Sequence, residues 1–231
     1  MRALCFCLLL SVPSISLAQD SKDFRKVSCR FLTLDSTTPP PPLLNLGDKG
    51  VEVPCTVNTH SLSPASVCHA KGNTLRFVTA SDHKPAANAT LPETAKACIL
   101  VFIRAPKTPE GLAWRIFVIE DTAKNLPNGG AFVANFHNAD IRFIIGENKI
   151  LLPPAKSHGF DMPAKRDAFN MAPVVFEFQR NGAWETVRES MLRFVPGMRY
   201  LIFAYVDPLS GRPSLATFRD FSTGAKPAPA K

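Results

Sequence analysis

Two cysteines and two histidines lie close together in the first half of the sequence and offer ligands that transition metals prefer. They are Cys55, His60, Cys68 and His69. Thiolate and imidazole groups together bind zinc or copper. The spacing matches none of the recurring ligand motifs, however, and the adjacent Cys68 and His69 would point to opposite faces of a strand. We therefore expect no metal at these residues, and nothing else in the sequence predicts a cofactor.

Cysteine pairing is the second chemistry that the sequence allows. Of the 6 cysteines, two lie in an apolar N-terminal run, and the disulfide candidates are Cys55, Cys68, Cys29 and Cys98. Four thiols in an oxidising compartment allow three connectivities. Local spacing favours Cys55 with Cys68, which leaves Cys29 with Cys98. Free buried thiols remain an equal alternative, because a small apolar thiol also suits a strand interior.

Residues of the types found in a catalytic triad occur once at short spacing, as Ser157, His158 and Asp161. A triad depends on geometry, and no Gly-x-Ser-x-Gly turn is present to expose a serine. The sequence also contains no glycine-rich phosphate loop and no His-Glu-x-x-His motif. We therefore expect a protein that is not an enzyme, with no catalytic and no cofactor-binding residues.

The N-terminus has the pattern of a cleaved secretory signal. Arg2 is followed by an apolar run, and Ser16 and Ala18 are small residues placed three and one positions before Gln19. This pattern predicts a signal peptide over residues 1–18, with cleavage after Ala18. No other segment is long and apolar enough for a membrane helix. We expect a periplasmic or secreted protein with no transmembrane segment.

Composition narrows the fold and the partners. The chain has 45% hydrophobic residues, which is enough for a packed core, and its 17 Phe and 21 Pro favour short strands over long helices. The formal net charge is +8, but the basic residues are dispersed and not interleaved with aromatic ones. We therefore expect no nucleic-acid partner. An acidic envelope polymer is a better match for this charge.

A pattern of strands and turns occurs twice in the sequence. Residues 46–54 and 145–153 each predict a strand, a tight turn with Gly and an acidic residue, a second strand and a proline. Other segments recur in the same order. The matches are Phe31 with Phe136, residues 75–77 with 174–176, residues 96–103 with 199–206, and residues 114–120 with 214–220.

The repeated pattern predicts an all-β fold of two tandem immunoglobulin-like antiparallel β-sandwich units. Residues 98–103 and 200–206 are apolar at every alternate position on both sides, so each should be a central strand covered on both faces. Asn181 and Gly182 predict a hairpin turn between an alternating run and a more polar strand. We place the first unit at residues 19–125, the second at 131–221, and a disordered tail at 222–231.

A signal followed by the two hairpin units at residues 46–54 and 145–153 resembles the uncharacterised exported β-sandwich proteins of Gram-negative bacteria. The resemblance concerns structure and transfers no functional residue. The paired sandwiches and basic charge are also similar to periplasmic pilus chaperones, which hold a subunit strand along a sheet edge.

The expected function is that of a non-catalytic exported envelope protein that binds another protein or a cell-surface polymer. Two alternatives stay open. One is a periplasmic assembly chaperone of the two-sandwich kind. The other is a small metal-binding or hydrolytic protein that uses the loops around residues 55–69 or 157–161.

Overall fold

The computed structural model describes residues 24–34, 37–104, 111–180, 182–207 and 210–221. The expected signal peptide and tail lie outside these residues. The first eight strands are β1 (Phe24–Thr33), β2 (Leu43–Leu46), β3 (Glu52–Cys55), β4 (Ser66–Lys71), β5 (Thr74–Thr79), β6 (Pro85–Thr90), β7 (Ala97–Arg104) and β8 (Trp114–Glu120). The next eight are β9 (Ala131–Asn135), β10 (Ile141–Ile145), β11 (Asn148–Leu152), β12 (Ser157–Phe160), β13 (Met171–Arg180), β14 (Ala183–Arg193), β15 (Arg199–Val206) and β16 (Pro213–Asp220).

Strands β1 to β8 build one β-sandwich. One layer has the order β4-β1-β7-β8, and the other has the order β3-β2-β5-β6. The layers are joined at the β4–β5 hairpin, where Lys71 pairs with Thr74. Their core contains Phe31, Phe77 and Phe102, whose rings meet edge to face with centroids 5.7 to 6.4 Å apart. Such aromatic contacts add to the stabilisation that burial alone gives.

Strands β9 to β16 repeat the same arrangement. Their layers have the orders β12-β9-β15-β16 and β11-β10-β13-β14, so each strand has a counterpart eight strands earlier. The prediction of an all-β fold is confirmed. The pairing is not purely antiparallel, because β1 runs parallel to β7 and β9 runs parallel to β15. Within the described part of the chain, no helix has the length and hydropathy needed to cross a bilayer.

The register of the two units differs from the match made by sequence. The N–H of Leu34 donates to the carbonyl of Phe102, and the N–H of Phe136 donates to the carbonyl of Ala204 in the equivalent position. Leu34, and not Phe31, is therefore the counterpart of Phe136. The match of residues 96–103 with 199–206 is wrong as well, by one residue, because Phe102 of β7 is equivalent to Ala204 of β15. A slip of one residue exchanges the faces of a strand, and strands that are apolar on both faces do not reveal it.

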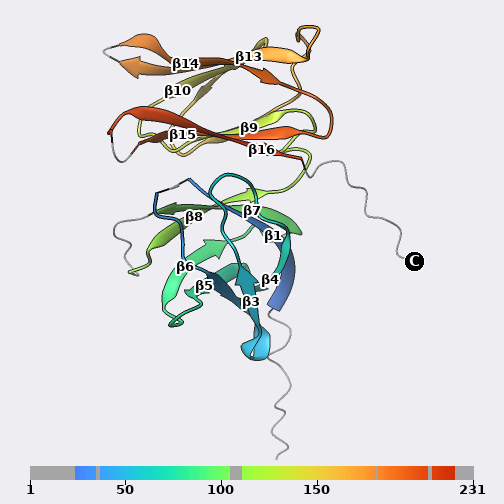
Figure 1. The fold of residues 1–231 in the computed structure, drawn as a ribbon, viewed down its shortest axis with the longest axis vertical. Helices are drawn as coiled ribbons and strands as arrows, with labels where there is room; N and C mark the ends of the chain where they lie inside the picture. The colour runs from blue at the N-terminus through green and yellow to red at the C-terminus, as the bar shows by residue number, and fades with distance from the viewer. Residues whose placement is uncertain (1–23, 35–36, 105–110, 181, 208–209, 222–231) are drawn as a thin grey trace, which may run out of the picture.

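The two sandwiches are stacked through the outer faces of their central strands (Figure 1). The layer that contains β1, β7 and β8 packs against the layer that contains β9, β15 and β16, and a third apolar core lies between them. Phe136 and Phe203 stack there with ring centroids 5.6 Å apart. The buried members of this core are Leu32, Ile99, Val101, Ile119, Leu126, Phe132, Ala134, Leu201, Phe203 and Phe218. The contact explains why β7 and β15 are apolar on both faces.

Two arginines and two aspartates form a closed, buried cluster beside this core. Arg30 of β1 contacts Asp220 of β16 through Nη1 at 2.8 Å and Asp121 through Nη2 at 2.7 Å. Arg199 of β15 contacts Asp220 through Nε and Asp121 through Nη2, each at 2.7 Å. Each arginine therefore joins a carboxylate of one sandwich to a carboxylate of the other. Equal numbers of opposite charges with short hydrogen bonds offset the cost of burial.

Candidate functional site

The cysteines and histidines near the start of the chain do not form a metal site. Cys55 and Cys68 are buried in the first sandwich, His69 lies on the other face of β4, and His60 is exposed in a loop. No group of three or more His, Cys, Asp or Glu side chains among the described residues could hold a metal ion. Because Cys68 and His69 are neighbours in a strand, their side chains point to opposite faces of the sheet.

The cysteines gather in the first core as free, buried thiols. Cys68 forms thiol hydrogen bonds with both Cys55 and Cys29. The hydrogen bond to Cys68 and burial raise the pKa of the Cys55 thiol far above the usual range, and the hydrogen bond to Cys29 and burial likewise raise the pKa of the Cys68 thiol. Cys29 is directly paired with Cys98 on the neighbouring strand. Burial raises the pKa of Cys98 to about 11. Thiols held in the protonated form are poor nucleophiles, and the predicted disulfide pairing stays a prediction.

The residues of the sequence-predicted triad are not assembled. Ser157 and His158 are adjacent in β12 and exposed, and Asp161 follows the strand and is also exposed. The His158 ring packs edge to face on Phe160, with centroids 4.9 Å apart. Since neighbouring strand residues point to opposite faces, Ser157 and His158 cannot form the hydrogen bond that activates a serine.

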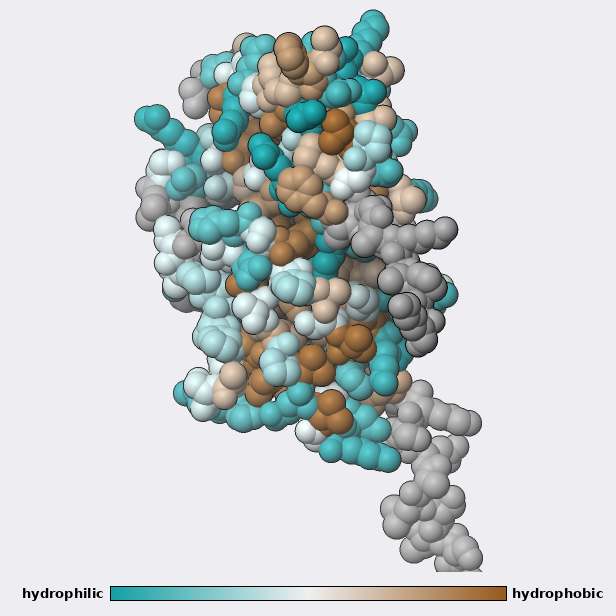
Figure 2. All heavy atoms as spheres, turned by 45° about the vertical axis from the view of Figure 1, so that its right-hand side comes forward, coloured by the Kyte–Doolittle hydropathy of each residue, from teal (hydrophilic) through white to brown (hydrophobic). Residues whose placement is uncertain are grey.

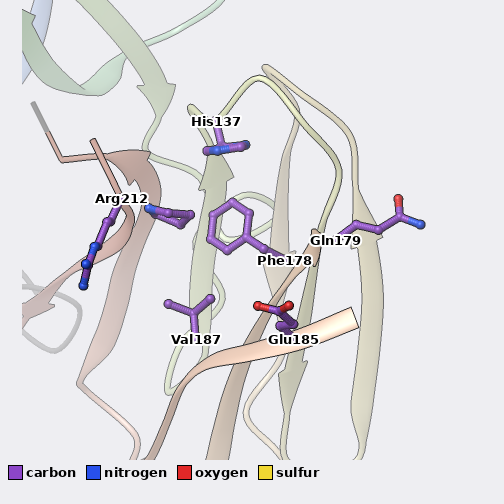
Figure 3. A pocket seen from close by; sticks show the side chains of 7 residues that line it. His137, Phe178, Gln179, Glu185, Val187 and Arg212 are labelled. Carbon is purple, nitrogen blue, oxygen red and sulfur yellow. The ribbon is translucent and has the colours of Figure 1, made fainter. Parts of the chain in front are cut away.

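The second sandwich has a cavity of about 370 Å³ on the side where β14 and β16 form its border (Figure 3). Its volume is within the range of ligand pockets. The lining side chains come from the β9–β10 turn, the β13–β14 hairpin and the start of β16. They are His137, Phe178, Gln179, Glu185, Val187, Arg212 and Pro213.

The equivalent side of the first sandwich is closed. There β6 packs against β8, and the small side chains of Ala86, Ala87 and Ala89 are buried in the core. Small residues let the two layers approach closely. The counterpart of β6 is β14, which is longer, has no fully buried residue and does not lie along β16 over their described residues. The cavity is therefore a consequence of the difference between β6 and β14.

The floor of the cavity is apolar. Phe178 points inward from β13 and is 4% exposed, and Pro213 opens β16 on the opposite layer. The pairing of β13 with β14 shifts register between Phe176 and Glu177, and this bulge adds Val187 to the inner side of β14. Val187 is 44% exposed, which is high for an apolar residue beside a core. The core of the second sandwich is thus incomplete at this edge.

His137 covers the floor from the β9–β10 turn. Its ring meets Phe178 edge to face, with centroids 4.5 Å apart. Burial lowers the pKa of His137, so the ring is neutral at pH 7, and Nδ1 accepts the N–H of Ala139 at 3.0 Å. Nε2 must then carry the proton. Asn135 is fully buried and fixes the turn, because it accepts the N–H of His137 at 2.8 Å and donates to Leu152 at 2.9 Å.

Charged and amide groups form the rim. Figure 3 shows Phe178 between His137 and Val187, with Arg212 on the β16 side and Glu185 on the β14 side. An apolar floor with a few polar groups at the border is typical of recognition sites. The lining includes no serine, threonine, cysteine or lysine that could act as a nucleophile.

The outer face of the same sheet holds β14 in place. The guanidinium of Arg142 lies 4.5 Å from the centre of the Trp184 ring and forms an ion pair with Glu177. The ion pair lowers the pKa of Glu177 and raises that of Arg142. This chain of contacts joins β10, β13 and β14, so the start of β14 is fixed although the strand ends the sheet.

The sequence did not predict the cavity residues as a site. A partial signal was present, since the run from Glu185 to Glu189 is polar except for Val187, where the equivalent strand of the first unit is rich in alanine. The cavity itself depends on β14 and β16, which are not paired with each other. Their separation cannot be read from either strand alone.

Comparisons with known proteins identify no family. No protein-family model matches the sequence, and no curated protein is similar to it. A solved structure from Bacteroides fragilis NCTC 9343, provisionally named a cell adhesion protein, aligns with 76% of this chain and 82% of its own length. The identity is 10% and the TM-score is 0.20. A TM-score of that size carries no argument about what this chain does.

Proposed function

We propose that this chain is a non-catalytic protein of the periplasm or cell surface that binds another protein. The partner contributes an extended segment, which lies beside β14 and adds a strand to the sheet β11-β10-β13-β14. Strand addition of this kind uses the free backbone N–H and C=O groups of an edge for affinity.

The length and exposure of β14 carry the proposal. It spans Ala183–Arg193 at the end of its sheet, and no residue in it is fully buried. Proteins usually keep such edges short or cover them. The edge strands β3, β11 and β12 follow that rule, with only 4 or 5 residues each. β8 and β16 also end their sheets and have 7 and 8 residues, and β14 is the longest of these edges with 11.

The side chains of β14 oppose unspecific pairing and leave selective pairing possible. Glu185, Arg188, Glu189 and Arg193 give the strand charges of both signs. Charged side chains on an edge deter aggregation, because a wrong partner would bring like charges together. The apolar cavity lies directly beside the strand and supplies a place for a partner side chain.

Site-specific photo-crosslinking tests the proposal in the native host. A photoreactive phenylalanine analogue replaces Glu189, which is exposed on β14, and in a matched control it replaces Val67, which is 53% exposed on β4. β4 is a strand of 6 residues that pairs with β1 along its whole length and with β5 only at the hairpin, where Lys71 pairs with Thr74. We expect a covalent adduct with one protein species at Glu189 and none at Val67.

Hydrogen exchange then separates strand addition from other contacts. The crosslinked partner is purified and added to the wild-type protein, and backbone exchange of β14 is compared with that of β4. An added strand should slow the exchange of alternate β14 amides by tenfold or more, since it pairs with their N–H groups. The same adducts at both positions, or an adduct without slowed exchange on β14, would contradict the proposal.

A further inference from the structure

We infer that the cavity beside β14 selects the partner segment by accepting one large apolar side chain, with an acidic residue next to it. This inference rests on the proposed function and adds a ligand class to it. It depends on the lining of the cavity and on the charges of the two strands at its border.

The position of the cavity relates it to a side chain of the added strand. Strands in a sheet lie about 4.8 Å apart and alternate side chains face one side, so inward-facing residues of a new strand lie beside those of β14. Beside Val187 such a residue would contact Phe178 and Pro213, which form the apolar floor. It would occupy the space that β6 and β8 close in the first sandwich.

The floor favours an apolar side chain of the size of phenylalanine, leucine or methionine. Burying a side chain of this kind should strengthen binding by about tenfold or more. A charged side chain would lose water without gaining a partner at Phe178, Val187 or Pro213. The ring edge of His137 adds an aromatic contact from above, and the neutral state of that ring avoids placing a charge beside an apolar ligand.

Two arginines at the border favour an acidic neighbour, and the carboxylate of the lining, that of Glu185, already takes part in another interaction. Arg188 pairs with the inward-facing Phe176, and it therefore lies on the cavity side of β14, while Arg212 lies at the start of β16. Over the part of the chain that the structure describes, neither guanidinium takes part in an ion pair. A carboxylate on the partner would form ion pairs with these two guanidinium groups. The formal net charge of +8 on the chain also attracts an acidic segment.

On the face shown in Figure 2, apolar side chains occur in patches separated by polar ones. Single exposed apolar residues on a surface need no ligand to explain them. The cavity differs from those patches because it is concave and continuous with a core.

Synthetic peptides test the inference on the full-length mature protein. The probe is a fluorescent nine-residue peptide, Thr-Val-Thr-Phe-Thr-Asp-Thr-Val-Thr, and its binding is measured by anisotropy. Replacing the central Phe by Ser should weaken binding about tenfold or more. Replacing Asp by Lys should weaken it by a similar factor, because Arg188 and Arg212 then meet a like charge.

Protein variants link each preference to its residue. Val187→Glu places a charge at the cavity from an exposed position and should remove the preference for Phe over Ser. Arg212→Glu should reverse the preference for Asp over Lys. The matched control Val67→Glu makes the same change at a similarly exposed residue of the first sandwich and should alter neither preference.

The outcomes separate this inference from the proposed function. If peptides slow exchange on β14 but bind equally well with Phe or Ser, strand addition stands and the cavity inference is wrong. If binding is unaffected by Val187→Glu and Arg212→Glu, the cavity inference is also wrong. If no peptide binds and no adduct forms at Glu189, both fail. Concentration-dependent self-association blocked by Val187→Glu would show a second copy as the occupant and would overturn the inference.

Discussion

The substitution Asp220→Asn tests whether the buried charge cluster fixes the two sandwiches to each other. The Asp220 carboxylate accepts hydrogen bonds from Nη1 and Nη2 of Arg30 at 2.8 and 3.0 Å, and from Nε of Arg199 at 2.7 Å. Its side chain is only 3% exposed. Asparagine keeps the shape but removes the negative charge, so two arginines then share a single carboxylate, that of Asp121.

The expected loss follows from that uncompensated charge. Removing one partner of a buried ion pair costs about 3 to 5 kcal/mol, because the remaining charge stays buried. The asparagine oxygen can still accept a hydrogen bond, so we expect about 3 kcal/mol. With a urea dependence of about 2 kcal/mol per molar, the unfolding midpoint should fall by roughly 1.5 M. Asp121→Asn should cost less, because that carboxylate is more exposed at 19% and accepts two of the bonds given above.

Urea unfolding followed by fluorescence can measure the effect on each sandwich. The 2 tryptophans of the chain fall one in each, Trp114 in β8 and Trp184 in β14. Trp184→Phe and Trp114→Phe backgrounds, each with and without Asp220→Asn, report the two sandwiches separately. Both midpoints should fall. The exposed control Asp161→Asn should change the free energy of unfolding by less than about 0.5 kcal/mol. A loss below about 1 kcal/mol for Asp220→Asn, or a shift in one sandwich alone, would refute the reasoning.

Three further predictions concern other features. Asn135→Ala removes the hydrogen bonds that hold the β9–β10 turn and should lower the free energy of unfolding by about 1 to 3 kcal/mol, and no change in urea midpoint would contradict this. Backbone N–H groups, first that of Ala164, lower the pKa of Glu147 below its unfolded value of about 4.3, so its stabilisation is present above that pH and is lost as pH falls through the folded pKa. Glu147→Gln should therefore reduce the loss of stability between pH 5 and pH 3 in urea titrations, and an unchanged pH dependence would argue against it. Refolding with glutathione disulfide should join Cys55 to Cys68, with the other two core cysteines joined to each other. Peptide mapping by mass spectrometry checks the pairing, and a Cys29–Cys68 peptide would rule it out.

The fold class could be predicted from sequence because its signals are local. Alternation in β13, the Asn-Gly turn before β14 and the glycine turns of the two hairpins each depend on a few neighbouring residues. Gly182, with φ of 80°, and Gly146, with φ of 59°, occupy the left-handed conformation that those turns require. The register of β7 against β15 could not be predicted in the same way, since both faces of each strand are apolar.

The charge cluster and the cavity depend on contacts between distant parts of the chain. Arg30 lies between apolar residues of β1, which marks it as unusual, but its partner Asp220 is 190 positions away. Phe178 in β13 and Val187 in β14 are apolar residues among polar neighbours, as inward-facing residues of a strand are. Val187 is exposed only because no strand covers it. The absence of a covering strand cannot be predicted from the residues that such a strand would have contacted.

The contact between the two sandwiches has the form of a twofold dimer joined into one chain. Each unit contributes the same layer to the contact. Asp121, just beyond β8, lies opposite Ala97 of β7, and Asp220, at the end of β16, lies opposite Arg199 of β15. The two aspartates therefore occupy equivalent positions in the two units. If the two units were separate subunits, the rate and the extent of their association through this self-complementary surface would depend on protein concentration. The short connection between β8 and β9 keeps the two surfaces at an effective concentration on the order of millimolar or above, so their assembly is independent of how dilute the protein is.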